Sequence, residues 1–234
     1  MSKNKIFTLY KILYKTYGQQ GWWPLINYDK KDVNSLDYHI GNYSFPKTES
    51  EVFEICLGAF LTQNVAFTSV VKSLHNLKTL NALTPQGIKN LDQESFKLAI
   101  KPSGYFNQKS KYILGFLHFF ETLNGTTPTR EALLGIKGIG EETAESILLY
   151  AYNQEEFVVD AYTKRVLFSL KLISEKSKYE EVKATMQEAL ESCIPKVQRI
   201  KVYQEYHALI VHHAKNHYSR KPYGKECMLH LFVY

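Results

Sequence analysis

The chain has 234 residues and a formal net charge of +6 at pH 7, from 29 basic and 23 acidic side chains. Hydrophobic residues make up 44% and aromatic residues 14% of the sequence, which excludes a disordered chain and allows one good core or two small ones. The positive excess suits a polyanionic partner, although many basic proteins bind none.

The three cysteines, Cys56, Cys193 and Cys227, are scattered and match neither a disulfide framework nor a metal-binding spacing. They fit a reducing compartment. The start of the chain has no signal-peptide pattern, and no later segment reaches about 18 apolar residues. We therefore expect a cytoplasmic protein that is not attached to a membrane.

The first predicted helix covers residues 6–17, where apolar side chains recur at helical spacing before a glycine. Trp22, Trp23 and Pro24 then open a polar, irregular stretch that runs to about residue 46. Two adjacent tryptophans beside a proline cannot both face one core from a regular helix. They fit either a plug between domains or a stacking platform for a base, and the residues alone favour neither.

A capping box begins at Thr48, with Glu51 three positions later, and predicts a helix that ends before the amides of Gln63 and Asn64. A further helix begins near Phe67. The polar junction between the two helices is also compatible with a simple N-cap.

The chain continues with a turn at Gly104 and a helix over about residues 112–120, beside basic residues that we interpret as a solvated face. A second capping box, from Ser177 to Glu180, predicts another helix, and the last long helix covers about residues 197–216. That helix carries three histidines, His207, His212 and His213. Their spacing supplies no clear third ligand, so no metal site is predicted.

A tight glycine turn stands between two short helical segments at Gly138, Ile139 and Gly140. A helix starting at Glu141 would expose its unpaired amides beside this turn, where a phosphate oxygen fits without any side chain. Asp160 follows 20 positions after Gly140, directly behind an apolar run. Taken alone, these features also fit a structural turn and an Asp that merely caps a helix.

The order of these motifs resembles the helix-hairpin-helix DNA glycosylase superfamily, which includes endonuclease III. The resemblance is greatest to the bacterial 3-methyladenine glycosylases of the endonuclease III type, and it covers about residues 20–220. It implies an all-α fold of two domains. A six-helix barrel with the hairpin would span residues 44–154, and residues 1–43 and 155–234 would form the second helical domain.

The resemblance also implies a role for each motif, with Asp160 as the catalytic carboxylate. The residues that it places against DNA, including the amide that fills the gap left by an extruded base, are Gln63, Asn64, Lys137, Gly138, Ile139, Gly140 and Thr143. Those that it places around the extruded base are Trp22, Trp23, Pro24 and Phe67. Which of Gln63 and Asn64 fills the gap stays open.

Bifunctional members of the superfamily have a lysine two positions after the second hairpin glycine, where this chain has Glu142. The resemblance therefore implies a monofunctional enzyme without lyase activity. An aromatic pocket favours bases that already carry a positive charge, such as alkylated purines, with 3-methyladenine first. The residues Ala161 and Tyr162, behind Asp160, depart from the pattern and weaken the substrate assignment.

Endonuclease III relatives hold an iron-sulfur cluster with four cysteines. At the matching positions this chain has one cysteine, Cys227, and the other three positions are His217, Gly224 and Val233. No cluster is predicted. The expected partner is duplex DNA containing alkylated bases, and the expected state is a monomer. The alternatives are a glycosylase for another damaged or mismatched base, a non-catalytic DNA-binding module and, less favoured, a metal-dependent nuclease.

Overall fold

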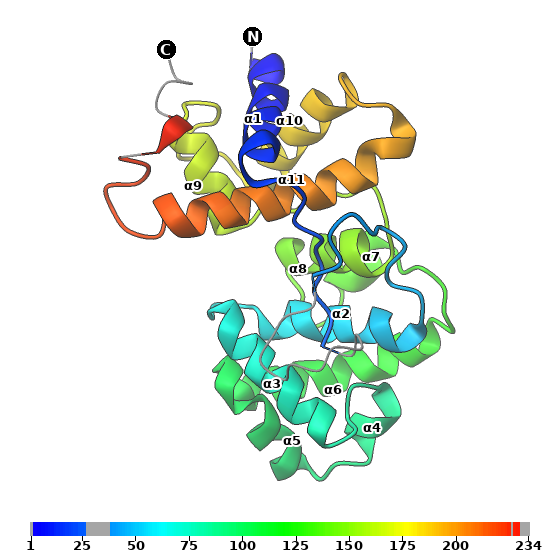
Figure 1. Cartoon of the computed structure of the whole chain (residues 1–234). Helices are drawn as coiled ribbons and strands as arrows, with labels where there is room; N and C mark the ends of the chain where they lie inside the picture. Colours follow the sequence, from blue (N-terminus) through cyan, green and yellow to red (C-terminus); the bar gives the residue numbers. More distant parts are fainter. Residues whose placement is uncertain (1, 27–37, 226, 230–234) are drawn as a thin grey trace. The chain divides into compact units, whose positions relative to one another are not determined.

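The computed structural model describes residues 2–26, 38–225 and 227–229 (Figure 1). These residues form helices and connecting loops, and this described part of the chain contains no extended strand, which confirms the all-α prediction. Residues 27–37, within the expected irregular stretch, and Val233 lie outside it.

The chain divides into two compact units. The central unit comprises residues 23–153, and the terminal unit combines residues 1–22 with residues 154–234. The division differs from the expected one at residues 23–43, because the described part of that segment groups with the central unit. Both ends of the chain belong to the terminal unit (Figure 1).

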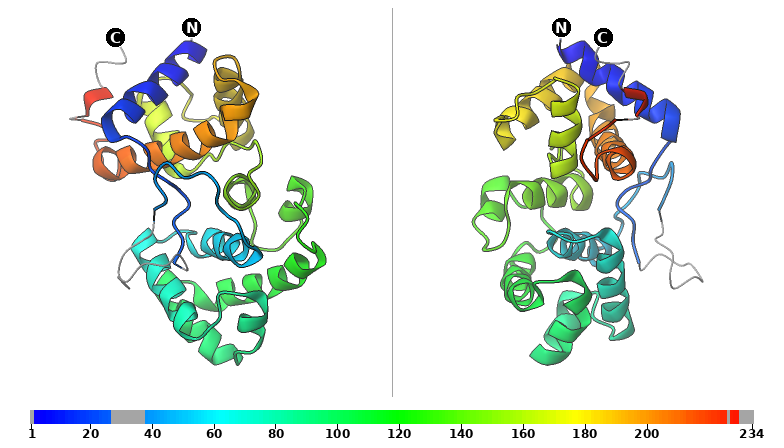
Figure 2. Two further views of the ribbon diagram at one scale, coloured as in Figure 1. Left: turned by 45° about the vertical axis from the view of Figure 1, so that its right-hand side comes forward. Right: turned by 90° about the vertical axis from the view of Figure 1, so that its left-hand side faces the viewer.

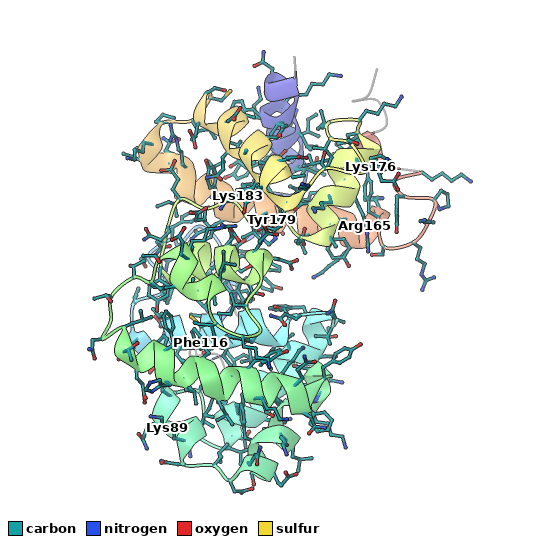
Figure 3. The ribbon with its side chains drawn as sticks, turned by 180° about the vertical axis from the view of Figure 1, so that it is seen from behind. Lys89, Phe116, Arg165, Lys176, Tyr179 and Lys183 are labelled. Atoms are coloured by element: carbon teal, nitrogen blue, oxygen red, sulfur yellow. The ribbon has the colours of Figure 1, made fainter. Side chains whose placement is uncertain are left out.

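The central unit is a bundle of short helices in which α2 packs against α3, α6, α8 and η2. Its elements are α2 (Glu49–Leu61), α3 (Phe67–Thr79), α4 (Pro85–Lys89), α5 (Gln93–Ile100), η1 (Lys101–Ser103), α6 (Phe106–Thr122), α7 (Arg130–Leu134), α8 (Glu141–Ser146) and η2 (Ile147–Ala151). Aromatic side chains fill the core between α2 and α6, where the ring of Phe60 lies 5.1 Å from that of Phe116, labelled in Figure 3. The apolar faces read from the sequence are therefore the buried ones.

Local signals set several helix ends in this unit. The Thr48 hydroxyl accepts the amide of Glu51, and Glu51 accepts the amide of Thr48 in return, so the predicted capping box is confirmed. α8 continues as a π-helical turn over η2 (Ile147–Ala151), which the regular helical spacing of its apolar residues did not predict.

The terminal unit is built from α1 (Ser2–Tyr17), α9 (Ala161–Ser169), α10 (Tyr179–Glu191) and α11 (Lys196–His217). α11 packs against α1, α9 and α10, and α1 also packs against α10 (Figure 2). Tyr206 of α11 is fully buried, with its ring 5.3 Å from Tyr10 and 5.9 Å from Phe157. An aromatic core thus joins segments from both ends of the sequence.

The predicted capping box at Ser177 is wrong. The Ser177 hydroxyl accepts the amide of Ser174 within the preceding turn. α10 begins at Tyr179. Its N-cap is Lys178, whose backbone amide donates to the Glu181 carboxylate. A serine hydroxyl can accept an amide from a turn or from the first turn of a helix, and here it accepts one from the turn.

Candidate active site

The hairpin lies in the central unit, and its backbone needs a glycine at the first position. Gly138 has a φ of +96°, and a Cβ there would lie 2.3 Å from the ring of Tyr112 on α6. Ile139 is buried and anchors the turn, with its amide donating to the carbonyl of Ile136 at 3.1 Å. The hairpin backbone is therefore held from beneath by packing.

Gly140 is exposed and is the N-cap of α8, with an extended backbone and no side chain to cap the helix. Nothing lies within 4 Å of the position that its Cβ would occupy. The first-turn amides of α8 have no acceptor within the helix. Lys137, also exposed, adds positive charge beside them. This geometry suits an anion that approaches the bare backbone.

The junction between α2 and α3 is tied to the hairpin by one side chain. Gln63 donates from Nε2 to the carbonyl oxygen of Gly138 at 2.9 Å and to the hydroxyl of Thr143 at 3.0 Å. Thr143 is buried, so its hydroxyl serves this internal contact. Asn64 is exposed and has a φ of +57°. The two neighbouring amides thus occupy different environments.

A buried lysine holds the same junction from the other side. The Lys109 ammonium on α6 donates to the carbonyl oxygens of Leu61 at 2.8 Å, Gln63 at 3.0 Å and Ser103 at 2.7 Å. Lys109 is only 3% exposed, and burial lowers its pKa to about 8. Lys109 therefore fixes the α2–α3 junction against the turn before α6.

Trp23 packs inside the central unit. It is 5% exposed, and its indole meets the ring of Phe67 at 5.9 Å and that of Tyr150 at 5.3 Å, both edge to face. Gly58 of α2 gives it space, because a Cβ there would lie 3.0 Å from the indole nitrogen. Pro24 is also buried. Trp23 and Phe67, both assigned to the base pocket by the resemblance, are thus in contact, and Tyr150 adds a third ring.

Trp22 belongs to the terminal unit and has different neighbours. The buried carboxylate of Glu205 accepts the amides of Gln20 at 2.7 Å and Gly21 at 3.2 Å, which fixes the backbone just before it. The Trp22 indole lies edge to face against the ring of His207 at 6.3 Å, and the Lys215 ammonium lies 5.8 Å from its centre. Trp22 and Trp23 are therefore packed into separate units.

Asp160 stands at the N-terminus of α9 and uses its two carboxylate oxygens differently. Oδ1 accepts the amide of Thr163 at 2.7 Å, which caps the helix. Oδ2 faces Nε2 of His207 on α11 at 3.8 Å. The residue before it is held as well, since the amide of Val159 donates to the hydroxyl of Tyr179 at 3.3 Å.

The chain segment just before Asp160 is held by ion pairs within the terminal unit. Lys183 on α10 contacts Glu156 at 2.5 Å, and Arg199 on α11 contacts Glu155 at 2.7 Å. Figure 3 shows Lys183 and Tyr179 on α10 and Arg165 on the neighbouring α9. The start of the segment that leads to Asp160 is thus anchored to α10 and α11.

The charge state of Asp160 follows from these contacts. Burial raises its pKa, but the nearby imidazole of His207 and the Thr163 amide lower it, and the net result is a pKa below the usual value of 3.8. The carboxylate is therefore ionised near neutral pH. An ionised carboxylate in a buried setting can stabilise a developing positive charge or take a proton from water.

The sulfur atoms do not fit an iron-sulfur cluster. Cys56 is buried in the central unit, whereas Cys193 and Cys227 belong to the terminal unit. The Cys227 thiol lies 3.5 Å from the hydroxyl of Tyr218. Four thiolates are needed, and the sequence has three cysteines.

The three histidines weighed above as metal ligands point to different partners: His207 to Asp160, His212 to the Gln20 amide oxygen at 2.9 Å, and His213 to the Tyr17 hydroxyl at 2.8 Å. Within residues 2–26, 38–225 and 227–229, no group of three or more His, Cys, Asp or Glu side chains could hold a metal ion. Over the same ranges, no helix is long and apolar enough to cross a membrane.

Comparison with known proteins identifies the family. Residues 57–192, more than half of the chain, match the HhH-GPD superfamily of base excision DNA repair proteins. The chain belongs to this superfamily. A protein of Methanocaldococcus jannaschii, provisionally named a DNA repair glycosylase, is 37% identical over 99% of this chain and 98% of its own. Endonuclease III of Sulfolobus acidocaldarius is 28% identical over 81% of this chain and 84% of its own.

Solved HhH-GPD structures share the fold. The 3-methyladenine DNA glycosylase of H. pylori, bound to 1,N6-ethenoadenine, superimposes with a TM-score of 0.68 at 26% identity, covering 92% of this chain and 97% of its own. An endonuclease III trapped in a covalent complex with DNA superimposes with a TM-score of 0.69 at 17% identity, over 99% of this chain and 95% of its own. The predicted helix-hairpin-helix glycosylase fold is confirmed.

Three residues of this HhH-GPD chain carry contacts that sequence reasoning did not assign to the site: Lys109, Tyr150 and His207. Lys109 lies in a basic run that we interpreted as a solvated face, and the structure corrects that interpretation for this residue, because its ammonium is buried on three carbonyl oxygens. His207 was considered only as a metal ligand. Its position among apolar residues of one helix face could have indicated that His207 is buried, but nothing in the sequence identifies its partner.

Proposed function

We propose that this protein is a monofunctional DNA glycosylase that hydrolyses the N-glycosidic bond of alkylated purines, 3-methyladenine first, in duplex DNA. It would extrude the damaged base, release it and leave an abasic site as the first step of base excision repair. Membership of the HhH-GPD superfamily establishes the class of DNA repair protein. The substrate and the mode of cleavage are the proposed parts.

The observation that carries the proposal is the ionised carboxylate of Asp160, capping α9 through Oδ1 with Oδ2 turned to His207. In the proposed reaction the bond from the sugar carbon to the base nitrogen breaks, and its electron pair leaves with the base. The sugar gains oxocarbenium character, which the Asp160 charge stabilises. Water then adds to the sugar carbon, and its proton passes to Asp160.

Alkylation at purine N3 or N7 makes the base cationic, so it leaves as a neutral molecule without being protonated by the protein. The aromatic side chains of Trp22, Trp23 and Phe67 suit such a base, since a cation over an aromatic face gains about 0.5–2 kcal/mol. The H. pylori relative, with 26% identity, is named a 3-methyladenine DNA glycosylase and is bound to 1,N6-ethenoadenine. Both bases belong in the first substrate panel.

The absence of lyase activity is proposed from Glu142. This residue is exposed in the first turn of α8 and carries a carboxylate where the resembled bifunctional enzymes carry an amine. A carboxylate cannot form a Schiff base with the sugar. We expect no covalent complex with DNA after borohydride treatment, and strand breaks only after alkali.

In the proposed complex with duplex DNA, the backbone amides of the hairpin bind a phosphate. An amide side chain fills the gap that the extruded base leaves in the stack. Gln63 is the better placed of the two amides, because it is bonded to the hairpin carbonyl of Gly138 and so lies beside the proposed anchor. Both of its bonds use Nε2, which leaves Oε1 to accept from the orphaned base. A monomer in the cytoplasm, without an iron-sulfur cluster, completes the proposal.

Base release from methylated duplex DNA by the wild type and by Asp160→Asn tests the proposal. We expect 3-methyladenine among the products, nicks only after alkali, and a rate at least roughly 10²-fold lower for the variant. Asp160→Asn keeps an acceptor for the Thr163 amide and so preserves the helix cap. If no methylated or ethenylated base is released, the alkylpurine assignment fails and oxidised and mismatched bases are the next substrates.

A non-catalytic DNA-binding module is the rival from another class. It predicts that Asp160→Asn binds DNA like the wild type and that neither protein releases any base. The place of Asp160, with one carboxylate oxygen facing His207 of another helix, argues against this rival, because a module that only clamps phosphate needs no such carboxylate. Activity that survives EDTA would exclude a metal-dependent nuclease.

A further inference from the structure

A buried histidine of α11 faces the carboxylate on which the proposed function rests. His207 is 5% exposed, and its Nε2 lies 3.8 Å from Oδ2 of Asp160. α9 and α11 pack along each other, so the two residues are held by rigid elements of one unit. We propose that His207 is a positioning residue that fixes the second oxygen of Asp160 and keeps this carboxylate in its reactive orientation.

The first oxygen of Asp160 already has a fixed place. Oδ1 accepts the Thr163 amide at 2.7 Å, and a bond to one oxygen does not by itself set the plane of the carboxylate. A second contact at Oδ2 sets that plane. Because His207 comes from a different helix, the carboxylate is held between two elements rather than by its own helix alone.

The orientation of His207 is itself constrained. The Trp22 indole stands edge to face against the imidazole, with an interplanar angle of 88°. Trp22 in turn follows a backbone segment that Glu205 holds through two amides. The position of the Asp160 carboxylate is thus coupled, through His207, to a residue proposed to contact the extruded base.

The other charged groups near this pair have their own partners. Lys215, the next charged residue along this part of α11, lies over the Trp22 ring. Burial lowers the pKa of Lys215, and the charge of Asp160 raises it by less. On α9, Lys164 lies over the ring of Tyr179, and Arg165 lies between Tyr162 and Tyr223. His207 thus stands 3.8 Å from Oδ2, on a helix other than the one that Asp160 caps.

The inference deepens the proposed function, so its first test does not depend on activity. The Asp160 carboxyl signal is followed by ¹³C NMR over a pH titration in the full-length wild type, His207→Phe and His207→Gln, and is assigned by its loss in Asp160→Asn. Phe keeps a ring without a donor, and Gln places an amide nitrogen near the position of Nε2. His212→Phe, at an exposed position of the same helix, is the matched control.

We expect the Asp160 titration to move to higher pH in His207→Phe, to return toward the wild type in His207→Gln and to stay unchanged in His212→Phe. With 3-methyladenine DNA, the single-turnover rate of His207→Phe should fall roughly 10-fold or more and recover in part in His207→Gln. Affinity for DNA carrying an abasic-site analogue should stay within about twofold, because no DNA contact is removed.

An unchanged Asp160 titration in both His207 variants would overturn the inference. Loss of affinity and rate together, without rescue by Gln, would also overturn it, because that pattern indicates a role in packing. If the titration moves as expected while the wild type releases no base from any substrate, the positioning of Asp160 stands and the proposed function fails. If His207→Phe does not fold, His207→Leu, which also lacks a donor, takes its place in the titration.

Discussion

The side-chain amide nitrogen of Gln63, Nε2, lies 2.9 Å from the backbone carbonyl oxygen of Gly138, so the α2–α3 junction and the glycine hairpin are joined by a hydrogen bond. The contact spans 75 positions of the sequence and is joined by a second bond to Thr143. In the proposed function, the group that fills the stack and the backbone that binds phosphate are therefore set at a fixed distance before DNA arrives.

Gln63→Ala should lower the single-turnover rate on duplex DNA roughly 10-fold, because it removes both the gap-filling amide and two hydrogen bonds that hold it. On single-stranded DNA the effect should be much smaller, since no gap is opened there. Asn64→Ala is the control at the exposed neighbour. A loss in Asn64→Ala that exceeds the loss in Gln63→Ala would assign the gap to Asn64 instead.

Gly138→Ala should destabilise the central unit by at least about 1–2 kcal/mol, since φ is positive there and the new Cβ would meet the Tyr112 ring. Gly140→Ala is the matched control, with an extended backbone and open space around the Cβ. Thermal unfolding measures both. Gly140→Ala should fold normally yet bind DNA more weakly, because a phosphate can no longer approach the bare backbone. Unchanged DNA affinity in Gly140→Ala would argue against the anchor.

Lys109→Met should lower the free energy of unfolding by about 2–4 kcal/mol, because three buried carbonyl oxygens lose their donor. Lys111→Met, at an exposed position of the same helix, should change it by less than about 0.5 kcal/mol. Denaturant unfolding compares the variants. Equal effects of the two substitutions would mean that the Lys109 contacts contribute nothing to stability.

The same lysine predicts a pH effect with a defined sign. Burial lowers its pKa from 10.5 to about 8, so between these values the unfolded chain binds more protons than the folded one. The contribution of Lys109 to stability therefore rises with pH across this window. The stability difference between the wild type and Lys109→Met should grow from pH 8 to pH 10. A difference that shrinks would contradict the lowered pKa.

Asp160→Ala and Asp160→Asn should separate the cap from the chemistry. Both should lose base release, but Asp160→Ala should also lose about 1 kcal/mol of stability, because only Asn keeps an acceptor for the Thr163 amide. The pKa of Asp160 is lowered in the folded state, so its ionic contribution is complete above the usual value and is lost as pH falls through the folded pKa. Thermal unfolding at pH 7 and at acidic pH checks both statements. Equal stability of the two variants at pH 7 would contradict the cap.

The sequence by itself determined several helix ends and the place of the hairpin. The capping box at Thr48, the glycine after Tyr17, the hairpin glycines and the proline before α11 act over a few residues, so their effects can be read without knowing the fold. The error at Ser177 shows the limit of this reasoning, because a serine hydroxyl can accept an amide either from a turn or from a helix start, and the residue pattern does not say which.

Only the tertiary structure decided how the candidate site is held together. Trp22 and Trp23 are adjacent in sequence yet pack in different units, and Gln63, Lys109 and His207 each contact a partner 46 or more positions away. Such partners depend on which faces meet when helices pack, and a helical pattern gives the face but not what lies opposite. Burial also decided the charge states, since the pKa of Lys109 and Asp160 depends on dehydration and neighbours that no sequence spacing reveals.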